Sequence, residues 1–222
     1  MKRKILVLIC FLFLIIFLII IQPQTKLVGI SKIDFNLDDD ELAVVFINQF
    51  PDSFLLFFNE EVRILVVLNY KKGNLQETLK KFNIRPVNVL LIKDIEIDFN
   101  YHKKIKLTTS YEEEDIRFKL EQNIIKVEYE EALFCIYVKR MEARNKFLDC
   151  DFIYFYHVLG ITHLDISKET DLIFYHNKRP LPTFLMEKIY ERWLDTYILR
   201  DDEFTIMKME EDYFNIIAIP NI

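Results

Sequence analysis

The sequence predicts a mixed α/β or α+β domain with a large sheet component, preceded by one transmembrane helix. Residues 5–21 are 17 consecutive apolar residues, close to the length that spans a bilayer. After residue 40, short runs rich in Val, Ile, Leu and Phe alternate with charged turn segments, as β-strands do. Two segments, residues 74–83 and 182–195, instead have apolar residues at helical spacing. Strands mixed with a few helices are typical of a layered domain built around a sheet.

The apolar run is expected to be an uncleaved signal anchor. It is longer than the apolar region of about 7–15 residues in a signal peptide. The Lys-Arg-Lys cluster at residues 2–4 favours a cytoplasmic N-terminus, which places the rest of a single-pass cell-membrane protein outside the cytoplasm. Cleavage is the alternative, with Gly29 and Ser31 as small residues at a distant site. The chain is thus divided into an anchor, a linker and a folded domain: residues 1–24, 25–40 and 41–222.

Strands are expected wherever β-branched and aromatic residues cluster between turn signals. The expected strands are residues 42–47, 53–58, 62–69, 87–92, 124–129, 132–138, 152–156, 172–175, 196–199, 204–209 and 214–219. Between the third and fourth of these, Leu75, Leu79 and Phe82 share one face of the expected helix 74–83. Residues 111–122 are dense in charge and fit either a helix or a surface ribbon.

The aromatic residues are interpreted as core rather than as a ligand-binding wall. In the expected helix 182–195, Leu185, Ile189 and Trp193 recur at every fourth position, so we expect Trp193 to pack. Strand aromatics are most often buried in a sheet core. The strand residues concerned are Tyr154, Phe155, Tyr156, Phe174 and Tyr175.

Composition excludes several classes of function. Three glycines cannot build a GxGxxG or Walker loop, and the three cysteines form no CxxC zinc motif. The net charge is −6, and setting aside the three positive charges at residues 2–4 leaves −9 on residues 5–222. A part that acidic is poorly suited to follow a phosphate backbone, so nucleic acid is not an expected partner.

Cys135 and Cys150 have two interpretations. Outside the cytoplasm they would meet oxidising conditions in many cells, and a disulfide would require Cα atoms within about 7 Å. Both cysteines lie in or beside apolar, strand-like stretches, so we interpret them as two small, unpaired core residues.

Seven local strings follow one another in an order that resembles a known family. They are residues 46–56, 65–69, 79–84, 88–99, 151–160, 173–182 and 197–206. Together they resemble the metallo-β-lactamase fold, in the version attached to ComEC-type competence proteins, over residues 42–219. The resemblance implies an αββα sandwich. In active members of the family, an HxHxDH motif and two later ligands hold two metal ions that activate a water molecule.

The same resemblance implies that this metal site has been dismantled. The two leading histidines of the motif correspond to Asp94 and Glu96, and its last histidine to Phe99, which has no donor atom. Asp98 keeps its identity, and His157 falls at the later histidine. The downstream aspartate has no secure counterpart. We therefore expect no catalytic residue and no cofactor.

An altered metal site is the alternative for Asp94, Glu96, Asp98 and His157. Alternate residues at a strand end point the same way, so the three carboxylates could converge on Mg²⁺ or Mn²⁺, while Zn²⁺ is the family's metal. The other interpretation is a solvated strand end, because converging carboxylates without a metal repel one another. The remaining family-motif positions are Asn48, which replaces an aspartate of the family, and Asp52, Ser53 and Asn177.

Three functions follow from these observations. The leading one is a membrane-anchored, non-catalytic metallo-β-lactamase-like domain, a pseudoenzyme, acting in binding or assembly outside the cytoplasm. Its partners would be the membrane, through residues 5–21, and an unidentified protein. The alternative is a nuclease-like, metal-dependent hydrolase. A DNA-uptake accessory that binds DNA without cleaving it is disfavoured by the negative charge.

Overall fold

A computed structural model describes most of the chain beyond residue 40. The described residues are 37, 41–49, 52–59, 61–71, 75, 79–80, 87–98, 101–138, 146–156, 164–201, 203–209 and 214–220. The chain divides into two compact units, Met1–Asp34 with Glu77–Arg85 and Phe35–Gln76 with Pro86–Ile222. Only Leu79 and Lys80 of the first unit are described, and both are helical.

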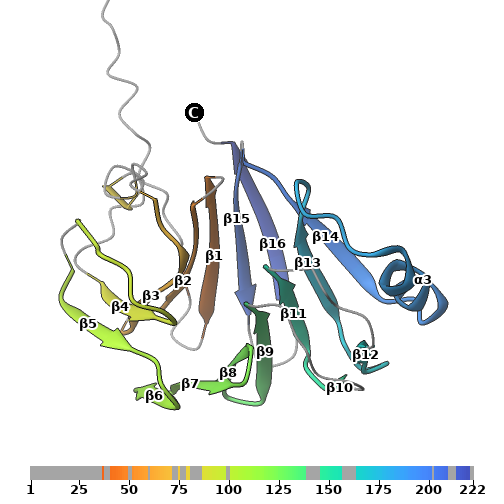
Figure 1. Cartoon of the computed structure of the whole chain (residues 1–222), viewed down its shortest axis with the longest axis horizontal. Helices are drawn as coiled ribbons and strands as arrows, with labels where there is room; N and C mark the ends of the chain where they lie inside the picture. The colour runs from red at the N-terminus through yellow and green to blue at the C-terminus, as the bar shows by residue number, and fades with distance from the viewer. Residues whose placement is uncertain are drawn as a thin grey trace, which may run out of the picture. The chain divides into compact units, whose positions relative to one another are not determined.

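Two seven-stranded sheets form most of the second unit (Figure 1). The first sheet has the order β16-β15-β1-β2-β3-β4-β5, and the second has the order β14-β13-β11-β9-β8-β7-β6. The strands of the first sheet are β1 (Leu42–Gln49), β2 (Asp52–Phe58), β3 (Arg63–Asn69), β4 (Asn88–Leu91), β5 (Lys103–Lys106), β15 (Glu203–Met209) and β16 (Phe214–Pro220). Those of the second are β6 (Ser110–Glu113), β7 (Ile116–Glu121), β8 (Ile124–Tyr129), β9 (Ala132–Tyr137), β11 (Phe152–Phe155), β13 (Leu172–His176) and β14 (Asp195–Leu199). A separate two-stranded sheet pairs β10 (Lys146–Leu148) with β12 (Leu164–Ile166).

Each large sheet mixes antiparallel and parallel pairing. In the first sheet β16, β15, β1, β2 and β3 are antiparallel neighbours, whereas β4 and β5 continue parallel to β3. In the second sheet β6 to β9 form an antiparallel meander, whereas β11, β13 and β14 continue parallel to β9. The interior strand β1 pairs Leu42 with Met209 of β15, so the beginning and the end of the domain meet in one sheet.

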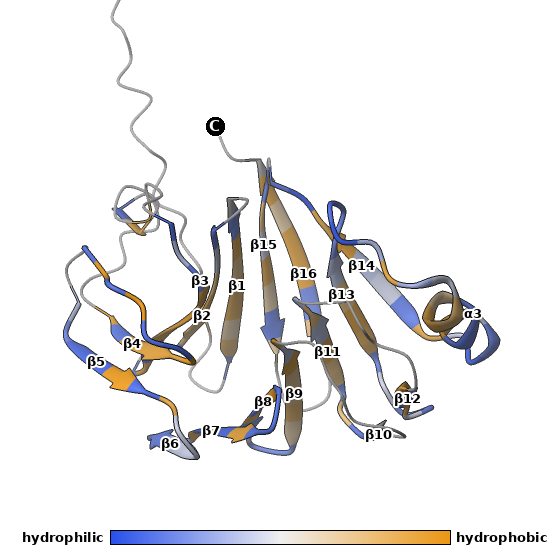
Figure 2. Ribbon diagram, viewed as in Figure 1, coloured by the Kyte–Doolittle hydropathy of each residue, from blue (hydrophilic) through white to orange (hydrophobic). Residues whose placement is uncertain are grey.

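The main core lies between the two sheets. Phe46 of β1 stacks on Phe174 of β13, with ring centroids 4.5 Å apart, and meets Tyr154 of β11 edge-on at 5.3 Å. Strand β1 is apolar and buried on both faces, since Val45 and Phe46 are 0% and 1% exposed. This is why its sequence is a nearly continuous apolar run rather than an alternating one. Figure 2 shows the same contrast between the hydrophobic β1 and the hydrophilic edge strand β6.

A second core lies on the outer face of the second sheet, beneath the helix α3 (Thr183–Glu191). Leu185 and Ile189 of α3 are 0% and 3% exposed, as the helical spacing predicted. The cluster also contains Cys135 and Cys150, which form a disulfide with Cα atoms 6.1 Å apart. Interpreting these cysteines as unpaired core residues was therefore wrong, although their burial was anticipated correctly.

The predicted αββα sandwich with an N-terminal transmembrane helix was wrong. The described residues are mostly β-strands in two sheets, and α3 is the one helix whose bounds can be given for them. None of the helices described is long and apolar enough to cross a membrane. The apolar run at residues 5–21, and with it the division of the chain at residues 24 and 40, lies outside the described residues.

The strand predictions were largely confirmed, and the departures have a local cause. All eleven expected segments overlap a strand, whereas β5, β10 and β12 were not expected. Residues 111–122 are a ribbon, since they contribute to β6 and β7. The tight turns of the meander place Glu114, Gln122 and Glu130 at φ values of 47°, 58° and 49°. Such left-handed positions usually hold Gly or Asn, so the sequence lacked the normal hairpin signal there.

The helix α3 ends earlier than its apolar spacing predicted. The Trp193 amide donates to the Tyr190 carbonyl over 3.2 Å, and the Leu194 amide donates to the Ile189 carbonyl over 3.1 Å. These two bonds, with Arg192 as C-cap, form a Schellman motif. Trp193 therefore turns away from the apolar stripe and is 87% exposed, so the expectation that it packs was wrong.

Candidate functional site

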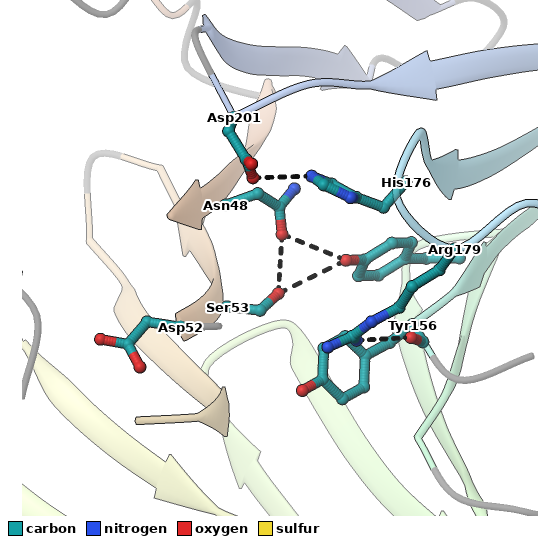
Figure 3. Close-up of a pocket in the computed structure, with 8 residues that line it drawn as sticks. Asn48, Asp52, Ser53, Tyr156, His176, Arg179 and Asp201 are labelled. Carbon is teal, nitrogen blue, oxygen red and sulfur yellow. Dashed lines mark hydrogen bonds and ion pairs between the residues drawn. The ribbon is translucent and has the colours of Figure 1, made fainter. Parts of the chain in front are cut away.

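A small polar pocket lies where the ends of strands from both sheets meet (Figure 3). Asn48 lies in β1, and Asp52 and Ser53 begin β2. The other residues come from β11 and the position after it, from the end of β13 and the turn that follows, and from the turn before β15. Those residues are Tyr154, Tyr156, His176, Arg179 and Asp201. The space they line is about 210 Å³ including open solvent, and the enclosed part has room for about one water molecule.

Strand pairing explains why these side chains meet. The β1–β2 register places Asn48 opposite Ser53. Strands β11 and β13 are parallel, so Tyr154 and His176 approach the same edge of the second sheet. The residues are therefore brought together by sheet topology, across more than a hundred positions of sequence.

The Ser53 hydroxyl is held in a neutral hydrogen-bonded cluster. Ser53 Oγ donates to Asn48 Oδ1 over 2.7 Å, and Tyr154 OH donates to the same oxygen over 3.3 Å. Burial raises the pKa of Tyr154, so its hydroxyl keeps its proton at neutral pH. Ser53 thus bonds to an amide and a phenol, neither of which can act as the base that a nucleophilic serine requires.

His176 is buried and has internal partners at both ring nitrogens. The backbone amide of Lys178 donates to His176 Nδ1 over 3.2 Å, so the proton of the neutral ring lies on Nε2. His176 Nε2 lies 2.9 Å from Asp201 Oδ1, and the other carboxylate oxygen of Asp201 pairs with Lys178 Nζ. Burial lowers the pKa of His176, and the Asp201 carboxylate partly opposes this effect. The lone pair of the neutral imidazole, on Nδ1, is thus taken by a backbone amide, and Nε2 faces the Asp201 carboxylate.

Arg179 and Asp52 are also directed toward partners within the chain. The Arg179 guanidinium lies 4.4 Å from the centre of the Tyr156 ring, and its NH1 donates to the Tyr156 carbonyl over 2.8 Å. Asp52 Oδ1 accepts a bond of 2.6 Å from the Lys71 amide, and Figure 3 shows its carboxylate pointing away from the other pocket residues. The pocket therefore resembles a polar connection between the sheets more than an open cleft.

We expect titration of His176 to follow its burial. Its pKa in the folded protein is expected below the ordinary value of 6.5, so the unfolded chain binds its proton first as the pH falls. Stability from this group is therefore complete above pH 6.5 and is lost as the pH falls through the lowered folded-state pKa. Asp201→Asn removes the carboxylate that opposes the shift, and should lower the pKa further. Proton NMR of the imidazole resonances measures both values, and an unchanged or higher pKa in Asp201→Asn would contradict this account.

Three of the four predicted motif positions lie in this pocket. Asn48, Asp52 and Ser53 line it, whereas Asn177 follows His176 in the next turn and donates its amide to the Leu199 carbonyl over 3.0 Å. His157 lies outside the described residues. Sequence reasoning did not place Arg179 or Asp201 in the site. The sequence feature that could have pointed to this pocket is that His176 ends an apolar strand beside a charged turn.

The acidic residues after β4 are exposed, and two of them contact other side chains of the chain. Asp94, Glu96 and Asp98 are all exposed, and alternate with half-buried isoleucines as a strand end would. Lys106 Nζ lies 2.8 Å from Asp94 Oδ1 and lowers the pKa of that carboxyl, while the Tyr70 hydroxyl donates to Asp98. Within the described ranges, no three His, Cys, Asp or Glu side chains are grouped so that they could hold a metal ion.

Comparison with solved structures gives a distant structural similarity. No family model matches the chain, and no curated protein matches it. The chain is similar to the crystal structure of a proposed zinc-dependent hydrolase of the metallo-β-lactamase superfamily from Thermotoga maritima. The TM-score is 0.36 at 11% sequence identity, with 72% of this chain and 74% of that chain covered. A similarity this distant carries no argument about the function of the present chain.

Proposed function

We propose that this chain is a non-catalytic domain that acts in binding or assembly outside the cytoplasm. The observation that carries the proposal is that the Nδ1 lone pair of His176 accepts a hydrogen bond from the Lys178 amide, while Nε2 lies 2.9 Å from Asp201 Oδ1. A general base or a metal ligand needs a free nitrogen lone pair. The neighbouring Ser53 hydroxyl is likewise committed to Asn48.

The cysteines support the proposed location. Disulfides form and persist in oxidising compartments and are rare in the cytosol. The pair Cys135–Cys150 crosslinks β9 to the segment that enters β11, inside a buried cluster. A domain built around such a crosslink suits the outer side of a membrane.

The proposed lack of catalysis is tested on the purified full chain in detergent. We expect substoichiometric zinc and manganese by elemental analysis, and no hydrolysis of a chromogenic phosphodiester above the protein-free rate, with or without added Zn²⁺, Mn²⁺ or Mg²⁺. The variants Asp98→Ala and His157→Ala are measured in parallel, because Asp98 and His157 occupy positions of the implied metal motif. Stoichiometric metal that is lost in these variants, together with metal-dependent turnover, would refute the proposal. Glu114→Gln, an exposed turn residue, is the control for a change of one carboxylate.

A further inference from the structure

Two large aromatic side chains stand exposed at the end of α3. Tyr190 is 78% exposed and Trp193 is 87% exposed, and their rings lie 6.2 Å apart with an angle of 24° between their planes. Most aromatic side chains described in this protein lie instead in the two core clusters. Tyrosine and tryptophan are the residues that most often dominate binding energy at interfaces.

Trp193 occupies a backbone position that suits glycine. It is the residue after the C-cap in the Schellman motif, with a φ of 59°. Glycine adopts this left-handed conformation without steric cost, whereas a bulky side chain does so unfavourably. The chain therefore keeps a tryptophan where it strains the backbone and gains no burial. Strain of this kind is most simply explained by a role in recognition.

The positive charges of the same helix are turned away from these rings. Lys188 Nζ donates to the Leu164 carbonyl over 2.8 Å, and Arg192 NH2 lies 2.7 Å from Asp165 Oδ1. Arg192 NH1 also donates to the Ile166 carbonyl. Both cations are thus committed to β12.

Three exposed side chains close to the two rings in the chain are acidic. Glu187 lies one turn before Tyr190 on the same helical face, and Glu191 and Asp195 are exposed beside the rings in the chain. We call Glu187, Tyr190, Glu191, Trp193 and Asp195 the aromatic patch. Aromatic faces attract cations, and the carboxylates add attraction of the same sign. The charge of −9 on residues 5–222 favours the approach of a basic partner as well.

We propose that the aromatic patch is a docking surface for a basic, Arg- or Lys-containing segment of a protein partner. An arginine side chain stacks on the Tyr190 and Trp193 rings, and neighbouring basic side chains pair with the carboxylates. This inference rests on the proposed binding role and names the chemistry of the partner. The docking proposal can fail while the proposed non-catalytic function holds, because the turnover and metal assays do not depend on the aromatic patch.

Binding is measured with the full chain held in an amphipathic polymer. Trp193 is the only tryptophan of the sequence, so its fluorescence reports on the patch alone. A short peptide of alternating Arg and Gly is expected to shift the emission to the blue and to protect Trp193 from iodide quenching. A matched Glu-Gly peptide is expected to do neither. If neither peptide changes the emission, the proposal is wrong.

The role of the rings is tested by Trp193→Gly, with binding read from the anisotropy of a labelled Arg-Gly peptide. Glycine suits the left-handed position, so the variant should melt at the same temperature as the parent or higher. Its affinity for the peptide should nevertheless fall about tenfold, from the lost cation–π and apolar contacts. Equal affinity in this folded variant would overturn the proposal.

The role of the carboxylates is tested by the triple variant Glu187→Gln, Glu191→Gln, Asp195→Asn. We expect about a tenfold loss of affinity for the Arg-Gly peptide, since each exposed ion pair contributes modestly. The control is Glu96→Gln, Glu114→Gln, Glu131→Gln, which changes net charge equally at exposed positions elsewhere. An equal loss in the control would mean that net charge alone attracts the peptide, and would contradict a defined surface. A blue shift with phosphatidylcholine vesicles but not with the peptide would assign the patch to a membrane and overturn the proposal.

Discussion

Phe134→Ala is expected to lower the free energy of unfolding by about 3–5 kcal/mol. Phe134 is 1% exposed and lies between the sheets, with its ring centroid 5.9 Å from that of Phe57 and 6.3 Å from that of Phe174. Truncation removes these contacts and leaves a cavity that the paired strands around it cannot readily close. Urea unfolding of the purified chain, followed by circular dichroism, measures the change.

The matched control for Phe134→Ala is Tyr101→Ala. Tyr101 is 40% exposed, so its truncation should change the unfolding free energy by less than about 1 kcal/mol. Similar losses in the two variants would mean that Phe134 is not part of a close-packed core between the sheets.

Removing the disulfide is also expected to lower the free energy of unfolding substantially. The double variant Cys135→Ala, Cys150→Ala should lose about 3 kcal/mol of unfolding free energy, because the crosslink closes a loop spanning 15 positions and restricts the unfolded chain. Urea unfolding with and without a reducing agent measures it. Reductant should destabilise the parent by a similar amount and leave the double variant unchanged. If reductant leaves the parent unchanged, the two thiols are not paired.

The sequence predicted the strands better than their arrangement. Segments such as residues 152–156 and 214–219 were identifiable because β-branched and aromatic residues cluster there between turn signals. The meander was ambiguous because its turns use Glu114, Gln122 and Glu130 in left-handed conformations that other residue types usually occupy. The resemblance implied an αββα layer order, whereas the described residues are mostly strands in two sheets. Local sequence patterns thus identified most strands, but they did not indicate how the strands are arranged in two sheets.

The pocket was only partly predictable for a related reason. Asn48 and Ser53 belong to one local motif and meet through the register of β1 and β2. The contact between His176 and Asp201 depends on the order of strands in the second sheet and on the turn that leaves it. No spacing rule in the sequence reports such a contact. For Trp193 the sequence pattern predicted too much. Apolar residues recur at every fourth position up to Trp193, but the helix ends before it.

The pairing of β1 with β15 has a consequence for how the domain is made. Leu42 pairs with Met209, so β1 cannot complete its pairing until β15, much later in the chain, has been synthesised. A nascent chain stopped before Glu203 lacks β15, so the edge of β1 that pairs with β15 stays open. An open strand edge can pair with other chains. Contacts this remote in sequence also slow the search for the native arrangement. Export of the polypeptide as an extended thread, with folding afterwards, is therefore compatible with this topology.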